Sequence, residues 1–132
     1  MNRHAQREGH TVVLHQVVSD DTYEISRLVR EIVNAQAPDL ILINGGTGLT
    51  RSDVTIEAVR PMFRKEIPAF ATLFTQLSFE AIDSAALLSR AAAGIIRKSA
   101  VFCLPGSINA CKLACKALIF PEAGHIAAHV QA

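Results

Sequence analysis

Two short apolar runs in the sequence each lead directly into a glycine-containing turn and then into a helical pattern. The first run covers residues 40–43 (LILI) and the second residues 100–104 (AVFCL). Short, continuous apolar runs are typical of strands buried on both faces, as in parallel sheets. Strands that alternate with helices predict a three-layer α/β/α domain with a mostly parallel sheet. Because such sheets bind ligands at the carboxyl ends of their strands, we expect both turns to border a binding site.

Other segments complete this prediction. Residues 11–18 (TVVLHQVV) are rich in β-branched residues and predict a further strand. Asp21 is expected to cap the next helix, with Glu24 as its capping-box partner, and an apolar stripe at helical spacing follows. Helical patterns are also found at residues 54–63, 69–77, 85–91 and 108–118, and Pro121 separates the last of these from a weaker segment through Val130.

The length and charge of the chain limit its class. A chain of 132 residues favours one compact domain, here residues 1–132. The formal charge of +1 and the scattered basic residues argue against nucleic acid as a partner. No apolar run approaches the about 20 residues that cross a bilayer, and the polar residues 1–10 do not resemble a signal peptide. We therefore expect a cytoplasmic protein with no membrane partner.

The turn after the first run is the strongest candidate for an anion site. Glycines after a buried strand let backbone N–H groups approach a phosphate, and the start of the following helix adds favourable partial charge. A tight strand-to-helix turn without a ligand is an equally good interpretation of the glycines alone. The spacing matches neither a P-loop nor a dinucleotide fingerprint. The residues of this turn are Gly45, Gly46, Thr47 and Gly48.

Two aspartates are candidates for binding Mg²⁺ near these glycines. Asp53 follows Gly48 closely and could hold Mg²⁺ against nucleotide phosphates, although it could equally serve as the N-cap of the next helix. Asp20 follows the predicted first strand and is expected at the same sheet edge. Asp21 already has a role as a helix cap, which leaves Asp20 as the freer carboxylate.

The remaining polar and sulfur-containing residues carry weaker signals. Ser89 and Arg90 could contact a phosphate, but solvent exposure explains them as well. The odd set of three cysteines includes two at helical i,i+4 spacing, which more often pack as small apolar groups than bind metal. His125 and His129 share a helical face without a third ligand and are interpreted as surface residues.

Residues 42–58 (LINGGTGLTRSDVTIEA) resemble the signature of the MoaB/MogA family of molybdenum-cofactor biosynthesis, in which T-G-G-T-G is followed by R-D-V-T-P-E-A. Later landmarks of that family have counterparts in the same order. They are residues 66–70 (EIPAF), the Leu88-Ser89-Arg90-Ala91 segment and the Leu104-Pro105-Gly106-Ser107 segment. The resemblance covers the chain from about residue 10 to residue 130, more than one glycine loop would by chance.

The resemblance implies a specific activity. Fuller enzymes of this family transfer AMP from ATP to the terminal phosphate of molybdopterin and release pyrophosphate. Two aspartates essential to that reaction match Asp20 and Asp53, which we assign to Mg²⁺ and phosphate positioning. Residues expected to bind the pterin or phosphate are Gly45, Gly46, Thr47, Gly48, Ser89, Arg90, Pro105, Gly106 and Ser107. The family also implies a homotrimer or hexamer.

One departure from the family bears on this expectation. Family members usually begin with a strand and a Ser-Asp loop that helps to form the nucleotide site, and here the first strand is apparently missing. A chain without it is expected to expose the edge of the neighbouring strand. Three functions therefore remain open: a molybdopterin adenylyltransferase, a pterin-binding or oligomeric module without turnover, and a weaker alternative, a pyrophosphatase of the competence-damage-protein kind.

Overall fold

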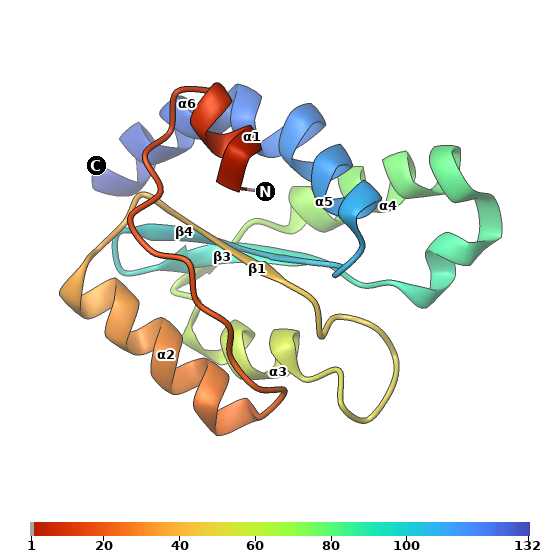
Figure 1. Ribbon diagram of the computed structural model, residues 1–132, viewed down its shortest axis with the longest axis horizontal. Helices are drawn as coiled ribbons and strands as arrows, with labels where there is room; N and C mark the ends of the chain where they lie inside the picture. The colour runs from red at the N-terminus through yellow and green to blue at the C-terminus, as the bar shows by residue number, and fades with distance from the viewer. Residues whose placement is uncertain (1) are drawn as a thin grey trace.

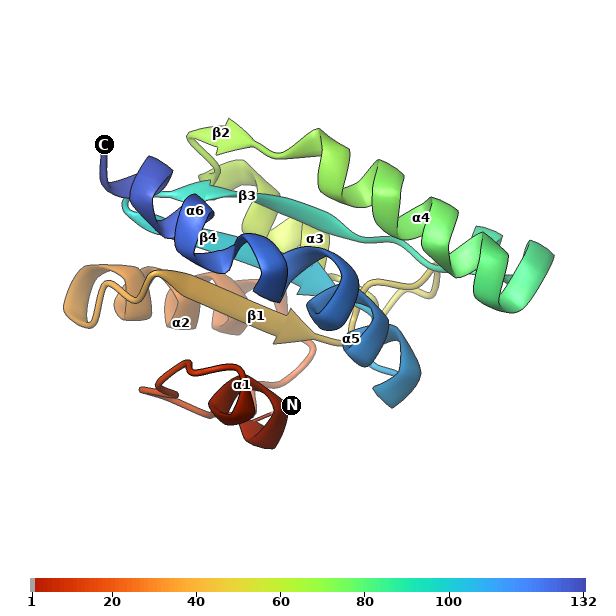
Figure 2. The ribbon, with the colours of Figure 1, turned by 90° about the horizontal axis from the view of Figure 1, so that it is seen from above.

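Residues 2–132, the part of the chain that the computed structural model describes, form a four-stranded sheet with helices on both faces (Figure 1). The strand order is β1–β4–β3–β2, and Figure 2 shows β2 at one edge and β1 at the other. The strands are β1 (Leu40–Asn44), β2 (Lys65–Glu66), β3 (Ala92–Ile96) and β4 (Ser99–Leu104). The two predicted apolar runs thus become β1 and β4, side by side.

The sheet is mixed, which refines the expectation of a mostly parallel one. β1 and β4 are parallel, with Leu40 opposite Ala100 and Asn44 opposite Leu104. β3 pairs antiparallel with both β4 and β2. The cause is a two-residue hairpin between β3 and β4, in which Arg97 adopts a positive φ of 54°. Its residues, Arg97 and Lys98, lack the Asn-Gly or Asp-Gly signal by which such a turn is found in a sequence.

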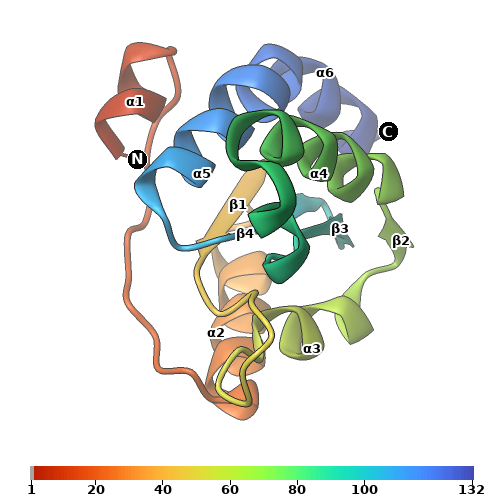
Figure 3. The same ribbon diagram turned by 90° about the vertical axis from the view of Figure 1, so that its right-hand side faces the viewer.

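The helices form two outer layers (Figure 3). α2 (Thr22–Ala35) and α3 (Thr55–Val59) cover one face of the sheet. α4 (Pro68–Ile82), α5 (Ile108–Ala114) and α6 (Phe120–Gln131) cover the other. The remaining helical segments are α1 (Asn2–Arg7), two 3-10 turns, Arg60–Met62 and Asp83–Leu88, and a π-helical segment, Cys115–Ile119.

β4 supplies side chains to both cores. All of its residues are buried, and alternate side chains point to opposite faces, as strand geometry requires. Phe102 and Leu104 pack against α4 and the C-terminal helices, whereas Val101 and Cys103 pack against α2 and α3. The three-layer architecture predicted from the sequence is therefore confirmed.

The start of α2 follows the predicted capping chemistry. Asp21 is the N-cap, and its carboxylate accepts a hydrogen bond of 2.9 Å from the Glu24 backbone N–H. The predicted apolar stripe buries Ile25, Val29 and Val33 against the sheet and α3. α2 is thus fixed both at its N-terminus and along its inner face.

Residues 11–18 are not a strand, so that prediction is wrong. They run in an irregular, largely exposed path outside the sheet and apart from β1 (Figure 3), and Val17 is 90% exposed. At the start of the segment, the His10 N–H donates to the Ala5 carbonyl, and the His10 ring packs on Phe120 with centroids 4.9 Å apart. β-propensity alone does not form a strand where the backbone does not join a ladder.

β1 differs from its prediction in burial. Its four aliphatic residues were expected to be fully buried, but each is only half-buried. The reason is its position, because in the described sheet β1 has a strand on one side only. β1 is therefore an edge strand of the described sheet, with one side open.

The C-terminal helices are also more continuous than predicted. Pro121 was expected to separate two segments, but the π-helical turn at Cys115–Ile119 joins α5 to α6, and Pro121 lies in the first turn of α6. Pro121 therefore does not interrupt the helical path. No helix within residues 2–132 is both long and apolar enough to span a bilayer.

Candidate functional site

The turns after β1 and β4 lie against each other at the carboxyl ends of these two strands. This edge of the sheet, called the binding edge below, faces the viewer in Figure 3. The Gly45 N–H donates to the Leu104 carbonyl at 2.8 Å, so the ladder continues one bond beyond the strands. A Cβ on Gly106 would come within 3.3 Å of the Gly45 Cα. The prediction that both turns share one edge is confirmed, because β1 and β4 are parallel neighbours.

The glycine loop, residues 45–48, has a backbone that requires glycine. Gly45 and Gly46 have φ values of 98° and 68°. The Thr55 hydroxyl donates to the Gly45 carbonyl at 2.9 Å, and the Thr55 N–H donates to the Gly46 carbonyl at 3.0 Å. A side chain on Gly46 would collide with that hydroxyl. Thr55 itself is only 3% exposed, so it fixes the loop from inside the fold.

Asp20 lies against this loop, as predicted. Its Oδ1 is 3.5 Å from the point where a Cβ on Gly46 would be. The sequence argument placed Asp20 here at the end of a strand, but no strand forms at residues 11–18. Asp20 is positioned instead by α2, which begins two residues later and packs against α3.

Asp53 lies against Gly48 of the loop, but it does not cap α3. The N-cap residue is Val54, and no side chain accepts a bond at that helix start. Asp53 Oδ2 accepts from the Thr50 hydroxyl at 2.8 Å and from the Thr50 N–H at 2.9 Å. These hydrogen bonds hold the pKa of the Asp53 carboxyl below its ordinary value, with a smaller contribution from the Gly48 N–H. Asp53 is therefore ionised and close to Gly48.

Arg90 connects the loop to α3. Its Nε donates to the carbonyls of Thr47 at 2.9 Å and Gly48 at 3.1 Å, and Nη2 donates to the Asp53 carbonyl at 3.3 Å. Both terminal nitrogens reach Glu57, at 2.6 Å and 3.1 Å. The hydrogen bond with Arg90 lowers the pKa of Glu57, and the same bond raises the pKa of Arg90. The guanidinium directs these donors to the protein, whereas contact with a ligand phosphate stays a prediction.

The other predicted binding residues occupy different environments. Thr47 is 2% exposed, so its side chain belongs to the support of the loop. Ser107 is exposed and caps α5, where its hydroxyl accepts from the Ala110 N–H at 3.1 Å. Ser89 is half-buried beside Arg90 and Pro105 is half-buried before the exposed Gly106. Their contact with a ligand stays a prediction.

Glu57 and Thr55 are the residues that sequence reasoning missed. Both fall within the glycine-loop signature, but no role was assigned to them. A hydroxyl and a carboxylate shortly after a glycine loop are a weak signal of loop support. Their partners could not be read from the sequence, because Arg90 is 33 residues from Glu57.

The cysteines and histidines that the structure describes belong to no cluster of metal ligands. No three His, Cys, Asp or Glu side chains within residues 2–132 form such a cluster. The three cysteines are buried free thiols, and burial raises the pKa of Cys103 to about 12 and that of Cys115 to about 11. The structural interpretation of the thiols therefore agrees with their burial.

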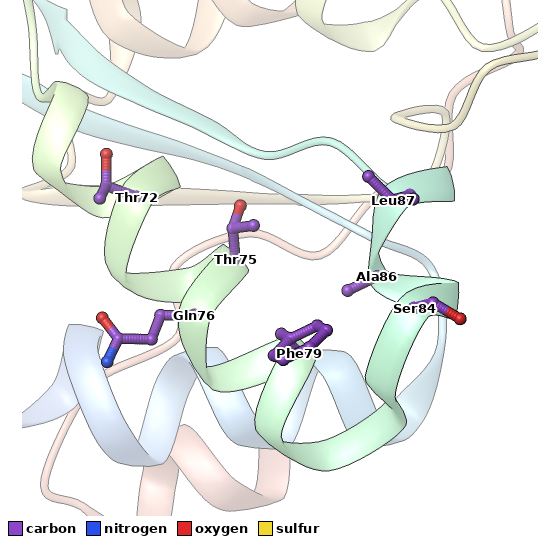
Figure 4. Close-up of a pocket in the computed structure, with 7 residues that line it drawn as sticks. All are labelled: Thr72, Thr75, Gln76, Phe79, Ser84, Ala86 and Leu87. Atoms are coloured by element: carbon purple, nitrogen blue, oxygen red, sulfur yellow. The ribbon is translucent and has the colours of Figure 1, made fainter.

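A groove of about 500 Å³ lies elsewhere, between α4 and the Asp83–Leu88 turn (Figure 4). It is lined mainly by apolar surface, including Phe79, Ala86 and Leu87, and by none of the predicted site residues. Because none of the predicted site residues line this groove, the candidate site remains the end of the sheet where the turns after β1 and β4 lie.

The fold and this edge define a class of protein: a three-layer α/β domain that presents a glycine loop and two carboxylates at the ends of parallel strands, an arrangement suited to phosphate-bearing ligands. Comparison with known proteins makes the class specific. The family described as "Probable molybdopterin binding domain" matches residues 1–125. The chain belongs to this family, as the sequence signature predicted.

Named relatives and a solved structure agree. "Molybdenum cofactor biosynthesis protein B" of Bacillus subtilis is 42% identical over 127 residues, which cover 96% of this chain and 75% of the relative. "Probable molybdopterin adenylyltransferase" of Methanocaldococcus jannaschii is 39% identical over 118 residues, covering 89% and 72%. A crystal structure of a molybdenum cofactor biosynthesis protein B superposes with a TM-score of 0.91 at 43% identity, over 96% of this chain and 79% of that one.

Proposed function

We propose that this chain acts in molybdenum cofactor biosynthesis by binding molybdopterin and transferring AMP from Mg-ATP to its terminal phosphate, with release of pyrophosphate. The observation that supports this most is the convergence of Asp20, Asp53 and the glycine loop at one sheet edge. The name of the Methanocaldococcus jannaschii relative supports the same reaction.

The reaction requires the protein to align the reacting phosphates and to neutralise their charge. A phosphate oxygen of the pterin attacks the α-phosphorus of ATP, the bond to the bridging oxygen breaks, and pyrophosphate leaves. The glycine loop offers backbone N–H groups that can approach phosphate oxygens without side chains in the way. Asp20 and Asp53 flank that loop, where they can fix the position of the reacting phosphates.

The two aspartates fit Mg²⁺. Magnesium is commonly held by one or two protein carboxylates together with substrate oxygens and water. Asp53 offers an ionised carboxylate whose lowered pKa keeps it charged at neutral pH, and the Asp20 carboxylate lies against the glycine loop near Gly46. When bound, Mg²⁺ supplies neutralisation of phosphate charge. Ser89, Pro105, Gly106 and Ser107 are proposed as contacts to the pterin or its phosphate.

A pterin-binding module without turnover is the second candidate. The observation that favours it is the unequal support of the two carboxylates. Asp53 accepts two hydrogen bonds from Thr50, whereas Asp20 follows residues 11–18, which form no strand in the structure. A site in which only one carboxylate is held firmly can bind a phosphate. It is less suited to the alignment of two substrates.

The deciding experiment is incubation of the purified chain with molybdopterin, Mg²⁺ and ATP, followed by measurement of pyrophosphate and adenylylated pterin by mass spectrometry. We expect product from the native chain and none from Asp53→Ala. Asp39→Ala is the matched control, because Asp39 is exposed at the opposite end of β1. Pterin binding without product in the native chain would favour the second candidate, and turnover by Asp53→Ala would reject the role given to that carboxylate.

Cytoplasmic location, which rests on the composition of the chain, and assembly into a homotrimer or hexamer, which rests on the family resemblance, are proposals. Exposed apolar side chains on α4 and the following turn, including Phe79, Ile82 and Leu87, are compatible with assembly. Light scattering of the purified chain would measure its mass directly.

A further inference from the structure

We infer that Arg90, tied in place by Glu57, is a positioning residue that presents the Asp53 carboxylate and the glycine loop in their working geometry. The inference deepens the proposed adenylyl transfer and depends on it for its catalytic consequence. Its structural part, the control of the loop by Arg90, stands on the geometry of residues 47–57 alone.

The first step concerns the peptide planes of the loop. The residues described contain no cis peptide bond, so each carbonyl points opposite to the N–H of the same peptide unit. Arg90 Nε holds the Thr47 and Gly48 carbonyls. The N–H groups of Gly48 and Leu49, which share those peptide units, are therefore turned away from Arg90. One side chain thus sets the direction of two consecutive backbone donors.

The second step connects these donors to Asp53. The Gly48 N–H is one of the groups that stabilise the ionised Asp53 carboxylate, and a Cβ on Gly48 would lie only 2.7 Å from Asp53 Oδ2. Arg90 Nη2 also donates to the Asp53 backbone carbonyl at 3.3 Å. Arg90 therefore acts on Asp53 twice, through the backbone of Asp53 itself and through the peptide unit that donates to its carboxylate.

The third step is the role of Glu57. Its two carboxylate oxygens accept from both terminal nitrogens of Arg90, a forked arrangement that fixes the plane of the guanidinium. The side chains of Arg90 and Glu57 are 32% and 51% exposed, and ion pairs this exposed add little to global stability. The effect of the pair is therefore local: it decides which way Nε points. Lysine at position 90 could not reproduce this, because it lacks the planar fork.

The test compares Glu57→Gln, Arg90→Lys and Arg90→Ala with the control Glu66→Gln. Glu66 also pairs with an exposed arginine, Arg60, at 3.0 Å, but no hydrogen bond of that pair reaches the glycine loop. Amide hydrogen exchange of the ligand-free protein is the first readout. We expect exchange of residues 47–50 to be faster by about tenfold in Arg90→Lys and Arg90→Ala and by less in Glu57→Gln, with no change in Glu66→Gln.

The second readout is turnover. A misplaced Asp53 should lower kcat by about 10- to 100-fold while the KM for ATP changes little, since small displacements of aligned groups act on the chemical step. Millimolar guanidinium ion should partly restore kcat to Arg90→Ala but not to Asp53→Ala. A purely structural role would lower the unfolding midpoint without a kcat effect or rescue.

Either readout can overturn the inference. Unchanged exchange at residues 47–50 in Arg90→Lys, or equal effects of Glu57→Gln and Glu66→Gln, would reject the positioning role. If Arg90→Ala does not fold, Glu57→Gln, which changes one exposed carboxylate, decides the question. If the native chain lacks adenylyl transfer, the proposed function fails, and the exchange data still decide whether Arg90 fixes the loop.

Discussion

The two turns at the binding edge are held by different means. The glycine loop after β1 is tied on its carbonyl side by Thr55 and Arg90, and both residues belong to distant or following segments. The turn after β4 depends on local bonds, the Ser107 cap and a 3.2 Å contact from the Cys111 Sγ to the Pro105 carbonyl. Gly106 and Ser107 are exposed, whereas Thr47 is buried. One turn is built into the fold and the other remains accessible.

This difference indicates a division of labour. A loop whose carbonyls are all engaged presents its N–H groups in a fixed direction and loses little conformational entropy when a phosphate binds. An exposed turn with a hydroxyl is better suited to contact a variable part of a ligand. The comparison therefore favours phosphate at the loop after β1 and pterin at the turn after β4.

The largest effect should come from adding a methyl group to each turn. Gly46→Ala forces a residue with a side chain to φ 68° and into the Thr55 hydroxyl, so we expect a loss of about 1–3 kcal/mol in the free energy of unfolding, or more. Gly106→Ala should cost less, about 1 kcal/mol, because its contact with Gly45 is tight but its φ is not positive. Urea unfolding of both variants measures this, and equal costs would contradict the contrast.

Removing one hydroxyl tests the support of the glycine loop. Thr55→Val keeps the shape of the side chain but leaves the Gly45 carbonyl without its donor, with an expected cost of about 1–2 kcal/mol. Thr72→Val is the control, because the Thr72 hydroxyl makes only an exposed 3.4 Å contact with the Pro68 carbonyl. Thermal unfolding should separate the two variants. A neutral Thr55→Val would mean that the backbone holds the loop without help.

Ser107 tests the accessible turn. Ser107→Ala removes the cap of α5 and should cost about 1 kcal/mol, whereas Ser107→Asp retains an acceptor and should restore most of that stability. Calorimetric titration with molybdopterin should show weaker binding for both variants, since neither offers the serine hydroxyl as a donor to the pterin. Undiminished binding by both variants would place the pterin away from this turn.

The smallest effect at neutral pH should belong to the buried Cys103 thiol, whose contribution to stability changes only at the alkaline end. The pKa of Cys103 is raised to about 12 from an ordinary 9.0, because burial disfavours the thiolate. The unfolded thiol ionises first, so the stabilisation is complete below pH 9.0 and is lost as pH rises toward about 12. Cys103→Ala should flatten this decline in denaturant titrations at pH 8 to 11. An unchanged slope would assign the decline to other groups.

Much of the binding edge followed from local sequence. The runs that became β1 and β4 were recognisable because each is short, apolar and followed by glycine, and their parallel pairing put both turns together. Asp21 was recognisable because a cap and its partner lie three residues apart. These features depend on neighbours in the chain, which a sequence displays.

Other features depend on partners that are distant in the chain and could not be predicted from the sequence. β3 was missed because alanine and glycine are poor strand formers, yet a Cβ on Gly94 would collide with the Phe63 ring, so packing requires the glycine. Residues 11–18 have the composition of a strand, but they run apart from the open edge of β1 and join no strand of the described sheet. The alternative that Asp53 caps the next helix was wrong, because its carboxylate accepts from the Thr50 N–H and hydroxyl instead.

The contact between Gly45 and Gly106 has a consequence for ligand selection. The separation of the two turns is set by bare backbone, since a Cβ on Gly106 would already lie 3.3 Å from the Gly45 Cα. Exchanges at neighbouring positions such as Ser89 or Ser107 can alter which groups a ligand meets without altering how far apart the two turns stand. The distance between the two turns and the chemical groups that a ligand meets are therefore set by different residues.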